Sequence, residues 1–199
     1  MQAASAVGIR AHSGWAALVT IAGTPPDIHI LDRRRVEICD PSIPGAKQPY
    51  HFVQKMDLAK AGNHLDGCAK ASQRLAESAL RELTRRYSLI GASILLASGR
   101  TLPLLPAILA SHALIHTAEG EFFRRSFQRA CAVLNITVEG VRERDLAALT
   151  PPAWQSRITQ MGKVIGPPWT QDHKLAALAA CLILSNEVQK HTSSPYRLG

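Results

Sequence analysis

Short apolar segments rich in β-branched and aromatic residues occupy the first forty positions. They lie at residues 6–9, 15–22, 28–31 and 35–39. A Ser-Gly pair separates the first two segments, and a turn signal with two prolines at residues 23–27 precedes the third. Val36 and Ile38 alternate with Glu37, as expected for a half-buried strand. We therefore predict that the chain opens with three antiparallel strands.

The hydrophobic pattern then changes to a helical period. Residues 40–63 contain prolines and glycines without a clear period, so we expect a loop with one short helix there. Apolar and small residues next recur at helical spacing, which predicts a helix capped by Asn63 with basic side chains on its opposite face. The apolar stripe consists of Leu65, Cys68, Leu75, Ala76, Ala79 and Leu83.

Longer apolar segments follow in the second half of the chain. The run at residues 89–97 is mostly apolar, which predicts a central strand covered on both faces. After the prolines at 103 and 106, a stripe of apolar residues and histidines predicts one helix that ends at Leu134. Residues 136–141 are expected to form a fifth strand.

The last fifty residues divide into a proline-rich segment and a helix. Residues 150–171 hold four prolines and two tryptophans, so we interpret them as a lid or binding loop, with a short helix around 154–161 as the alternative. The two tryptophans could stack on bases, or anchor the loop. Residues 172–189 are rich in alanine and leucine nearly all round, which predicts a helix buried against the sheet.

Charge points to anionic partners. The sequence of 199 residues has a formal net charge of +8, which favours phosphate-bearing molecules such as RNA or DNA. No apolar run reaches the roughly 18 residues of a membrane span, and the first residues lack the pattern of a signal peptide. The four cysteines are widely separated, without a Cys-x-x-Cys pair. We expect a cytoplasmic protein with reduced thiols and no membrane association.

The order of predicted elements resembles that of the ribonuclease H-like superfamily. Locally, Phe127-Gln128-Arg129-Ala130 and Glu143-Arg144 are similar to a helix and strand of the YqgF-type pre-ribosomal RNA nucleases, and residues 174–180 are similar to the last helix of that branch and of the resolvase RuvC. The resemblance implies an α/β fold with a central mixed five-stranded sheet, three antiparallel strands and then two parallel ones, flanked by helices. We expect residues 1–191 to form this single domain and residues 192–199 a flexible tail.

The same resemblance implies that catalytic acids are replaced in this chain. Nucleases of this superfamily hold divalent metal between carboxylates. The first-strand position is Arg10 here, the end of the fourth strand offers Ser98-Gly99-Arg100, and the last-helix position is Lys174. Fixed positive charges cannot coordinate magnesium and repel it. We therefore expect the two-metal site to be absent, with Arg10, Arg100, Lys174 and Arg144 as candidate nucleic-acid contacts.

Other residues keep a catalytic reading open. Asp172, Glu119 and Glu143 could supply carboxylates for magnesium or manganese in a metal-dependent nuclease. His112 and His116 stand one helical turn apart, a spacing that can place two imidazoles on one transition metal, with Glu119 on the same face. His12 and His173 could join them. Two histidines in an apolar stripe are also compatible with ordinary packing or interface roles.

Three functions remain open on this basis. The first is a non-catalytic domain that binds nucleic acid or a protein partner through a basic, degenerate site. The second is the metal-dependent nuclease, and the third is a structural or assembly protein that forms a homo-oligomer or a complex. Salt bridges from Arg10 and Lys174 to Glu119 or Glu143 would indicate that the former metal site has become structural.

Overall fold

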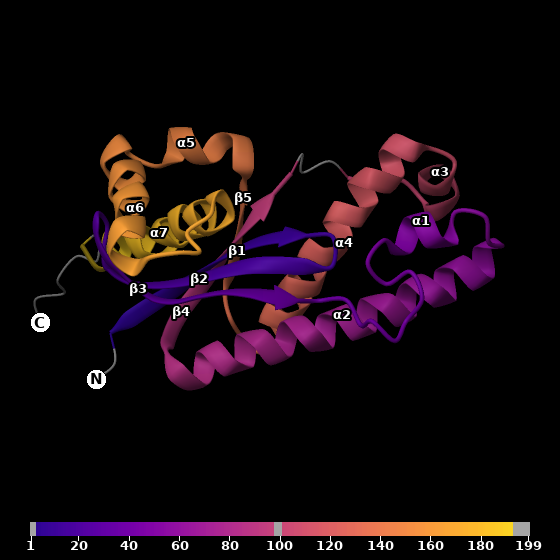
Figure 1. The fold of residues 1–199 in the computed structure, drawn as a ribbon, viewed down its shortest axis with the longest axis horizontal. Helices are drawn as coiled ribbons and strands as arrows, with labels where there is room; N and C mark the ends of the chain where they lie inside the picture. Colours follow the sequence, from indigo (N-terminus) through magenta and orange to yellow (C-terminus); the bar gives the residue numbers. More distant parts are fainter. Residues whose placement is uncertain (1–2, 98–100, 193–199) are drawn as a thin grey trace, which may run out of the picture.

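A five-stranded sheet forms the centre of the computed structural model, which describes residues 3–97 and 101–192 (Figure 1). The strands lie side by side in the order β3-β2-β1-β4-β5. Their bounds are β1 Ala4–His12, β2 Trp15–Thr24, β3 Asp27–Glu37, β4 Ser88–Leu96 and β5 Val138–Arg142. The first three strands are antiparallel, whereas β1, β4 and β5 are parallel to one another. The expected mixed sheet is therefore confirmed.

Tight turns join the first three strands, as their sequence predicts. Ser13-Gly14 is a two-residue turn that leaves His12 paired with Trp15, and Gly14 has a positive φ of 83°, which glycine adopts without steric cost. The carbonyl of Gly14 accepts a hydrogen bond of 2.8 Å from the backbone of Ile38, just beyond β3. The hairpin end is thus tied to the chain that leaves the sheet.

Helices cover both faces of the sheet. Their bounds are α1 Pro49–Val53, α2 Leu58–Arg86, α3 Leu105–Leu109, α4 His112–Val133, α5 Leu146–Leu149, α6 Pro152–Ile165 and α7 Gln171–Thr192, with a 3-10 turn η1 at Glu143–Asp145. Because side chains alternate along a strand, Val7 and Ile9 pack into a core with Leu80 of α2 and Phe123 of α4. Ala6 packs instead into the core around α7.

The helix α7 lies unusually close to β1. A Cβ atom on Gly8 would stand 1.7 Å from the carbonyl oxygen of Ala176. The facing helix residues Ala176, Ala177, Ala179 and Ala180 are all fully buried, so small side chains on both elements allow the backbones to approach. This packing explains the alanine-rich sequence, and it sets the position of the first turn of α7.

Two predicted helix boundaries are corrected by capping geometry. The helix α2 begins at Leu58, not after Asn63, because Asp57 has extended backbone and its side chain accepts a hydrogen bond of 2.9 Å from the backbone of Lys60. The single helix expected before Leu134 is two helices, since Ser111 is extended and caps α4.

We expect replacement of the Asp57 cap by alanine to lower the free energy of unfolding by about 1 kcal/mol, since the first turn of α2 loses a hydrogen-bond acceptor. Urea unfolding measures the difference. Asp66, an exposed residue farther along α2, is the matched control, and its replacement by alanine should cause no loss. Equal stabilities of the two variants would contradict the assigned cap.

The proline-rich segment at 150–171 is mostly helix, so the expected lid or binding loop is wrong and the alternative of a short helix is correct. Pro152 occupies the first turn of α6, where proline is well tolerated. The indole of Trp169 donates a hydrogen bond of 2.8 Å to the carbonyl of Ile158, and Trp154 packs against the core beneath α7. Both tryptophans therefore anchor this segment to the fold.

Three expectations concern the ends and the surroundings of the chain. Arg100 and its neighbours Ser98 and Gly99 lie outside the described residues, as do residues 193–199 of the expected tail. The single-domain boundary at 191 stays a prediction. Among the described residues, no helix is both long and apolar enough to cross a membrane.

Candidate functional site

One edge of the sheet gathers charged side chains from three elements. Arg10 lies near the carboxyl end of β1, Glu143 directly follows β5, and Asp172 lies in the first turn of α7. The carboxyl ends of parallel strands meet at one edge, and β1 and β5 both run parallel to β4 between them. Arg10 shares its face of β1 with Gly8, which packs on α7, so the fold directs it toward Asp172.

Arg10 is held between the two carboxylates. Its Nε and Nη2 donate to Oε2 and Oε1 of Glu143 at 3.0 and 2.8 Å, a bidentate pairing, while its Nη1 donates to Oδ1 of Asp172. The side chains of Arg10, Glu143 and Asp172 are 21%, 42% and 22% exposed, so the cluster is only partly open to water. One fixed positive charge thus occupies the space between two acids.

The surrounding groups keep this cluster ionised. Burial alone would raise the pKa of Asp172, but hydrogen bonds from His12 and Arg10 outweigh it and hold that pKa below its ordinary value. Burial likewise opposes the charge of Arg10, and the pairing with Glu143 and Asp172 still raises the Arg10 pKa. Asp172 and Arg10 are therefore both charged at neutral pH.

An aromatic stack extends the cluster toward β2 and β3. Nε2 of His12 lies 2.9 Å from Oδ1 of Asp172, and the His12 ring stacks on Trp15 with centroids 4.2 Å apart. The guanidinium carbon of Arg35 lies 3.9 Å from the centroid of the Trp15 ring. Of the histidines expected near a metal, His12 is thus engaged by an acid of this cluster.

A second guanidinium lies close by, from α4. Arg124 is half-buried, and its Nε donates a hydrogen bond of 2.9 Å to the carbonyl of Leu95 at the end of β4. Burial lowers its pKa, against the opposing effect of the Glu121 and Glu143 charges. No sequence signal distinguished Arg124 from the other basic residues of its helix, because its role depends on contacts between α4 and β4.

The other basic candidates lie around the cluster. Lys174, on α7, lines a pocket of about 220 Å³ together with Glu143, Gln155 and Thr159. Arg144 is exposed, with its Nε 3.5 Å from a carboxylate oxygen of Asp145. Among the described residues, these two side chains present positive charge beside the Arg10 cluster and outside its ion pairs.

Glu119 and the histidine candidates occupy a different place. Glu119 is 3% exposed, and its Oε1 accepts hydrogen bonds from the backbones of Tyr50 and His51, at 2.9 and 3.0 Å. It therefore contacts α1 and not Asp172 or Glu143. Nε2 of His112 and Nε2 of His116 lie 3.0 Å apart on α4.

His173, the remaining histidine candidate, contacts the residues that directly precede α7. Its Nδ1 lies 2.8 Å from the hydroxyl of Thr170, and its ring stacks on Trp169. The structure therefore joins neither His12 nor His173 to His112 and His116. It adds instead His51 of α1, which sequence reasoning missed.

The residues at the Arg10 cluster do not fit a two-metal centre. Magnesium and manganese require several oxygen ligands. Here both carboxylates already bind the guanidinium of Arg10, which stays positively charged at any physiological pH. A metal at this place would meet the fixed charge of Arg10 within a few ångströms. The arrangement can support a stable ion-pair network at the sheet edge, beside positive groups open to anions.

Comparison with known proteins supports the fold. No protein-family model and no curated protein sequence matches the chain. Among solved structures, RuvC of Thermus thermophilus in complex with a Holliday junction substrate matches with a TM-score of 0.58, 10% identity, and coverage of 95% of this chain and 96% of RuvC. A second T. thermophilus RuvC structure matches with a TM-score of 0.54, 10% identity and coverage of 96% and 97%.

The chain has a ribonuclease H-like fold. The agreement extends over nearly the full length of both chains, and the mixed sheet has the strand directions expected of this fold. At 10% identity, the likeness to RuvC concerns the fold alone. The closer resemblance to the YqgF-type branch stays a prediction, as does the replacement of former catalytic acids in this ribonuclease H-like domain.

Proposed function

We propose that this ribonuclease H-like protein binds nucleic acid without cleaving it, at the sheet edge that holds Arg10, Glu143 and Asp172. The observation that carries the proposal is the guanidinium of Arg10 between the two carboxylates. The RuvC structure with a Holliday junction substrate shares this fold, so a branched DNA is the first ligand to test. The net charge of +8 supports an anionic partner.

The absence of cleavage follows from charge. Metal-assisted hydrolysis of a phosphodiester needs carboxylates free to hold divalent ions beside the attacked phosphate. Glu143 and Asp172 instead neutralise Arg10, and the low pKa of Asp172 keeps that pairing intact. The nuclease alternative with Asp172, Glu119 and a histidine also lacks support, because Glu119 bonds to α1.

Binding is assigned to positive groups around this cluster that lie outside its ion pairs. The guanidinium of Arg10 donates its hydrogen bonds to carboxylates. Lys174 lines the adjacent pocket and Arg144 is exposed next to Glu143, so these two side chains can contact a phosphate. Lysine and arginine contacts to phosphates release counterions, so the affinity should fall steeply as salt rises. Arg100 stays a candidate for the same role.

We expect the double variant Lys174→Gln, Arg144→Gln to bind a four-way DNA junction more weakly and with a smaller salt dependence. Each lost phosphate contact should reduce the slope of log K against log salt by about 0.9. Fluorescence anisotropy of a labelled junction, measured from low to moderate salt, gives both quantities. Duplex DNA and duplex RNA in parallel titrations identify the preferred nucleic acid.

A matched control comes from α2, on the other face of the sheet. Lys60→Gln, Arg85→Gln removes the same charge from two exposed positions of that helix and should change the salt slope much less. Equal salt slopes in the two double variants would mean that nucleic acid binds at another surface of the protein. No salt-sensitive binding of any probe at low salt would overturn the proposal and favour a structural or assembly role, which sedimentation of the pure protein would then examine.

A further inference from the structure

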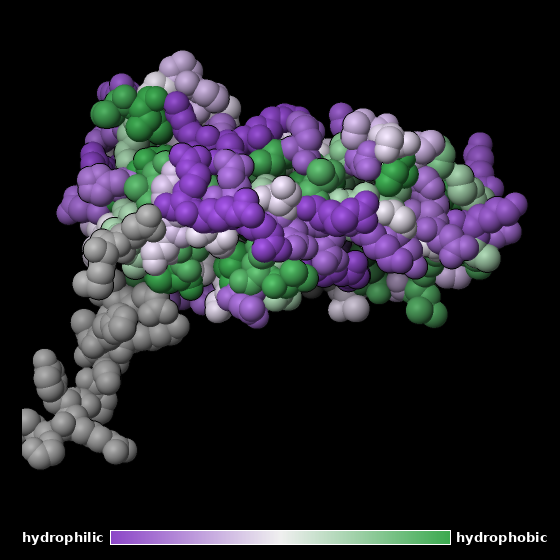
Figure 2. All heavy atoms as spheres, turned by 90° about the horizontal axis from the view of Figure 1, so that it is seen from below, coloured by the Kyte–Doolittle hydropathy of each residue, from purple (hydrophilic) through white to green (hydrophobic). Residues whose placement is uncertain are grey.

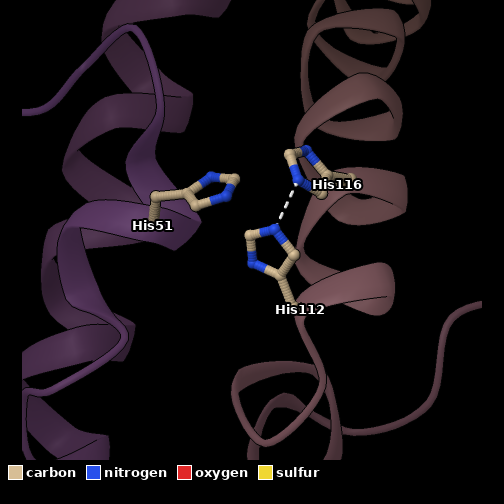
Figure 3. Close-up of side chains that lie close together, drawn as sticks. All are labelled: His51, His112 and His116. Carbon is tan, nitrogen blue, oxygen red and sulfur yellow. Dashed lines mark hydrogen bonds between the residues drawn. The ribbon is translucent and has the colours of Figure 1, made fainter.

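Three histidine side chains converge between α1 and α4 (Figure 3). His51 comes from α1, and His112 and His116 come from the first two turns of α4. One ring nitrogen from each residue lies within 4.8 Å of the other two. In Figure 1, α1 and the start of α4, next to α3, lie at the right of the molecule, away from α5, α6 and α7, so this cluster is separate from the Arg10 cluster.

The helical spacing of two of these histidines suits shared coordination. Residues four apart lie on one face of a helix, and Nε2 of His112 is 3.0 Å from Nε2 of His116. The ring of His51 points across to both, with ring centroids 5.6 Å from His112 and 4.8 Å from His116. Imidazole is a preferred ligand of zinc and related transition metals.

A buried acid orients the third histidine. Nδ1 of His51 lies 3.2 Å from Oε1 of Glu119, which also accepts hydrogen bonds from the backbones of Tyr50 and His51. This contact uses one ring nitrogen of His51 and leaves Nε2 for a metal. Histidine ligands of zinc commonly have such a carboxylate on their other nitrogen.

Glu119 itself is an unusual residue to bury. It is 3% exposed, and among the described residues its Oε2 has no hydrogen-bond partner. A buried carboxylate needs a compensating positive charge or a full set of donors. A divalent ion on the adjacent histidines would supply that charge through His51.

We propose that His51, His112 and His116 bind a zinc ion, with Glu119 as the residue that positions His51. Zinc–nitrogen bonds of about 2.1 Å in a tetrahedral site place ligand nitrogens about 3.4 Å apart, which small side-chain rotations reach from the present spacing. Because His112 and His116 are exposed, the fourth position faces solvent and takes water or an anion. The ion would join α1 to α4.

The test is calorimetric titration of the full chain, freed of metal by a chelator, with zinc chloride. One zinc ion is expected at the histidine site, accompanied by a higher melting temperature. The double variant His112→Gln, His116→Gln should lose that ion, whereas His29→Gln, which removes an exposed histidine of β3, should retain it. Glu119→Gln should weaken binding about 10- to 100-fold.

Cysteine thiols also bind zinc, so the ligands must be identified separately. Cobalt is substituted for zinc because its visible spectrum distinguishes thiolate from imidazole ligands. The native protein should show the visible bands of tetrahedral cobalt without a thiolate charge-transfer band, since all three ligands are imidazoles. Circular dichroism checks that the variants are folded. Absence of zinc binding, equal zinc affinity in the double histidine variant, or a thiolate band would each overturn the proposal. Junction binding should be unchanged in that variant, so this test is independent of the proposed function.

Discussion

Replacing Gly8 with alanine is expected to lower the free energy of unfolding by about 3 kcal/mol, the upper end for an overpacked core. The added Cβ would stand 1.7 Å from the carbonyl oxygen of Ala176, which is backbone and cannot rotate away. The helix α7 would have to shift from β1, and the core formed by its buried alanines would open. Urea unfolding followed by circular dichroism measures the loss.

A second glycine provides the control for this substitution. Gly67 lies on the exposed face of α2, and a Cβ there would have no atom within 4 Å. Gly67→Ala should therefore stabilise the protein, by up to about 1 kcal/mol, because alanine favours the helix. If Gly8→Ala were as stable as the native protein, the close contact of α7 with β1 would be wrong.

Replacing Arg10 with methionine is expected to lower the free energy of unfolding by about 2 kcal/mol at neutral pH. This value lies between those for exposed and for buried ion pairs. The length of the side chain is kept, but Glu143 and Asp172 lose their shared cation and face each other as like charges. Arg81→Met, which breaks the exposed pair with Glu77 on α2, should cost less than about 0.5 kcal/mol.

The cost of Arg10→Met should depend on pH in a defined direction. The pKa of Asp172 is lowered in the native state, so its contribution to stability is present above the ordinary carboxylate pKa and is lost as pH falls through the lowered value. The difference between variant and native protein should thus be largest near neutral pH and shrink below about pH 4. Unfolding curves at several pH values measure it, and a constant difference would mean that lost packing dominates.

The fold could be predicted largely from local patterns. Alternating residues in the first forty positions and the apolar run at 89–97 specify strands, and the order of elements restricts how they can join. Helix ends were less predictable, because Asp57 and Ser111 act through backbone geometry that their neighbours in sequence do not reveal. The segment at 150–171 could not be predicted from its prolines, because prolines at its start also suit the first turn of a helix.

The two clusters differ in how far sequence could lead. The resemblance to ribonuclease H-like proteins points to Arg10 and offers Glu143 and Asp172 as candidate carboxylates, and the structure brings all three together. His51 lies in a five-residue helix within a proline-rich loop, and 61 positions separate it from His112, so no periodic pattern connects them. Only the packing of α1 on α4 places Glu119 beside it.

The central claim is that this protein binds nucleic acid and leaves it intact. The most direct measurement incubates the protein with a labelled four-way DNA junction in magnesium and then in manganese, and examines the same samples by anisotropy and by denaturing gel. We expect a bound junction, binding that weakens with salt, and no cleaved strand. Cleavage that disappears in Asp172→Asn would contradict it and establish the nuclease alternative.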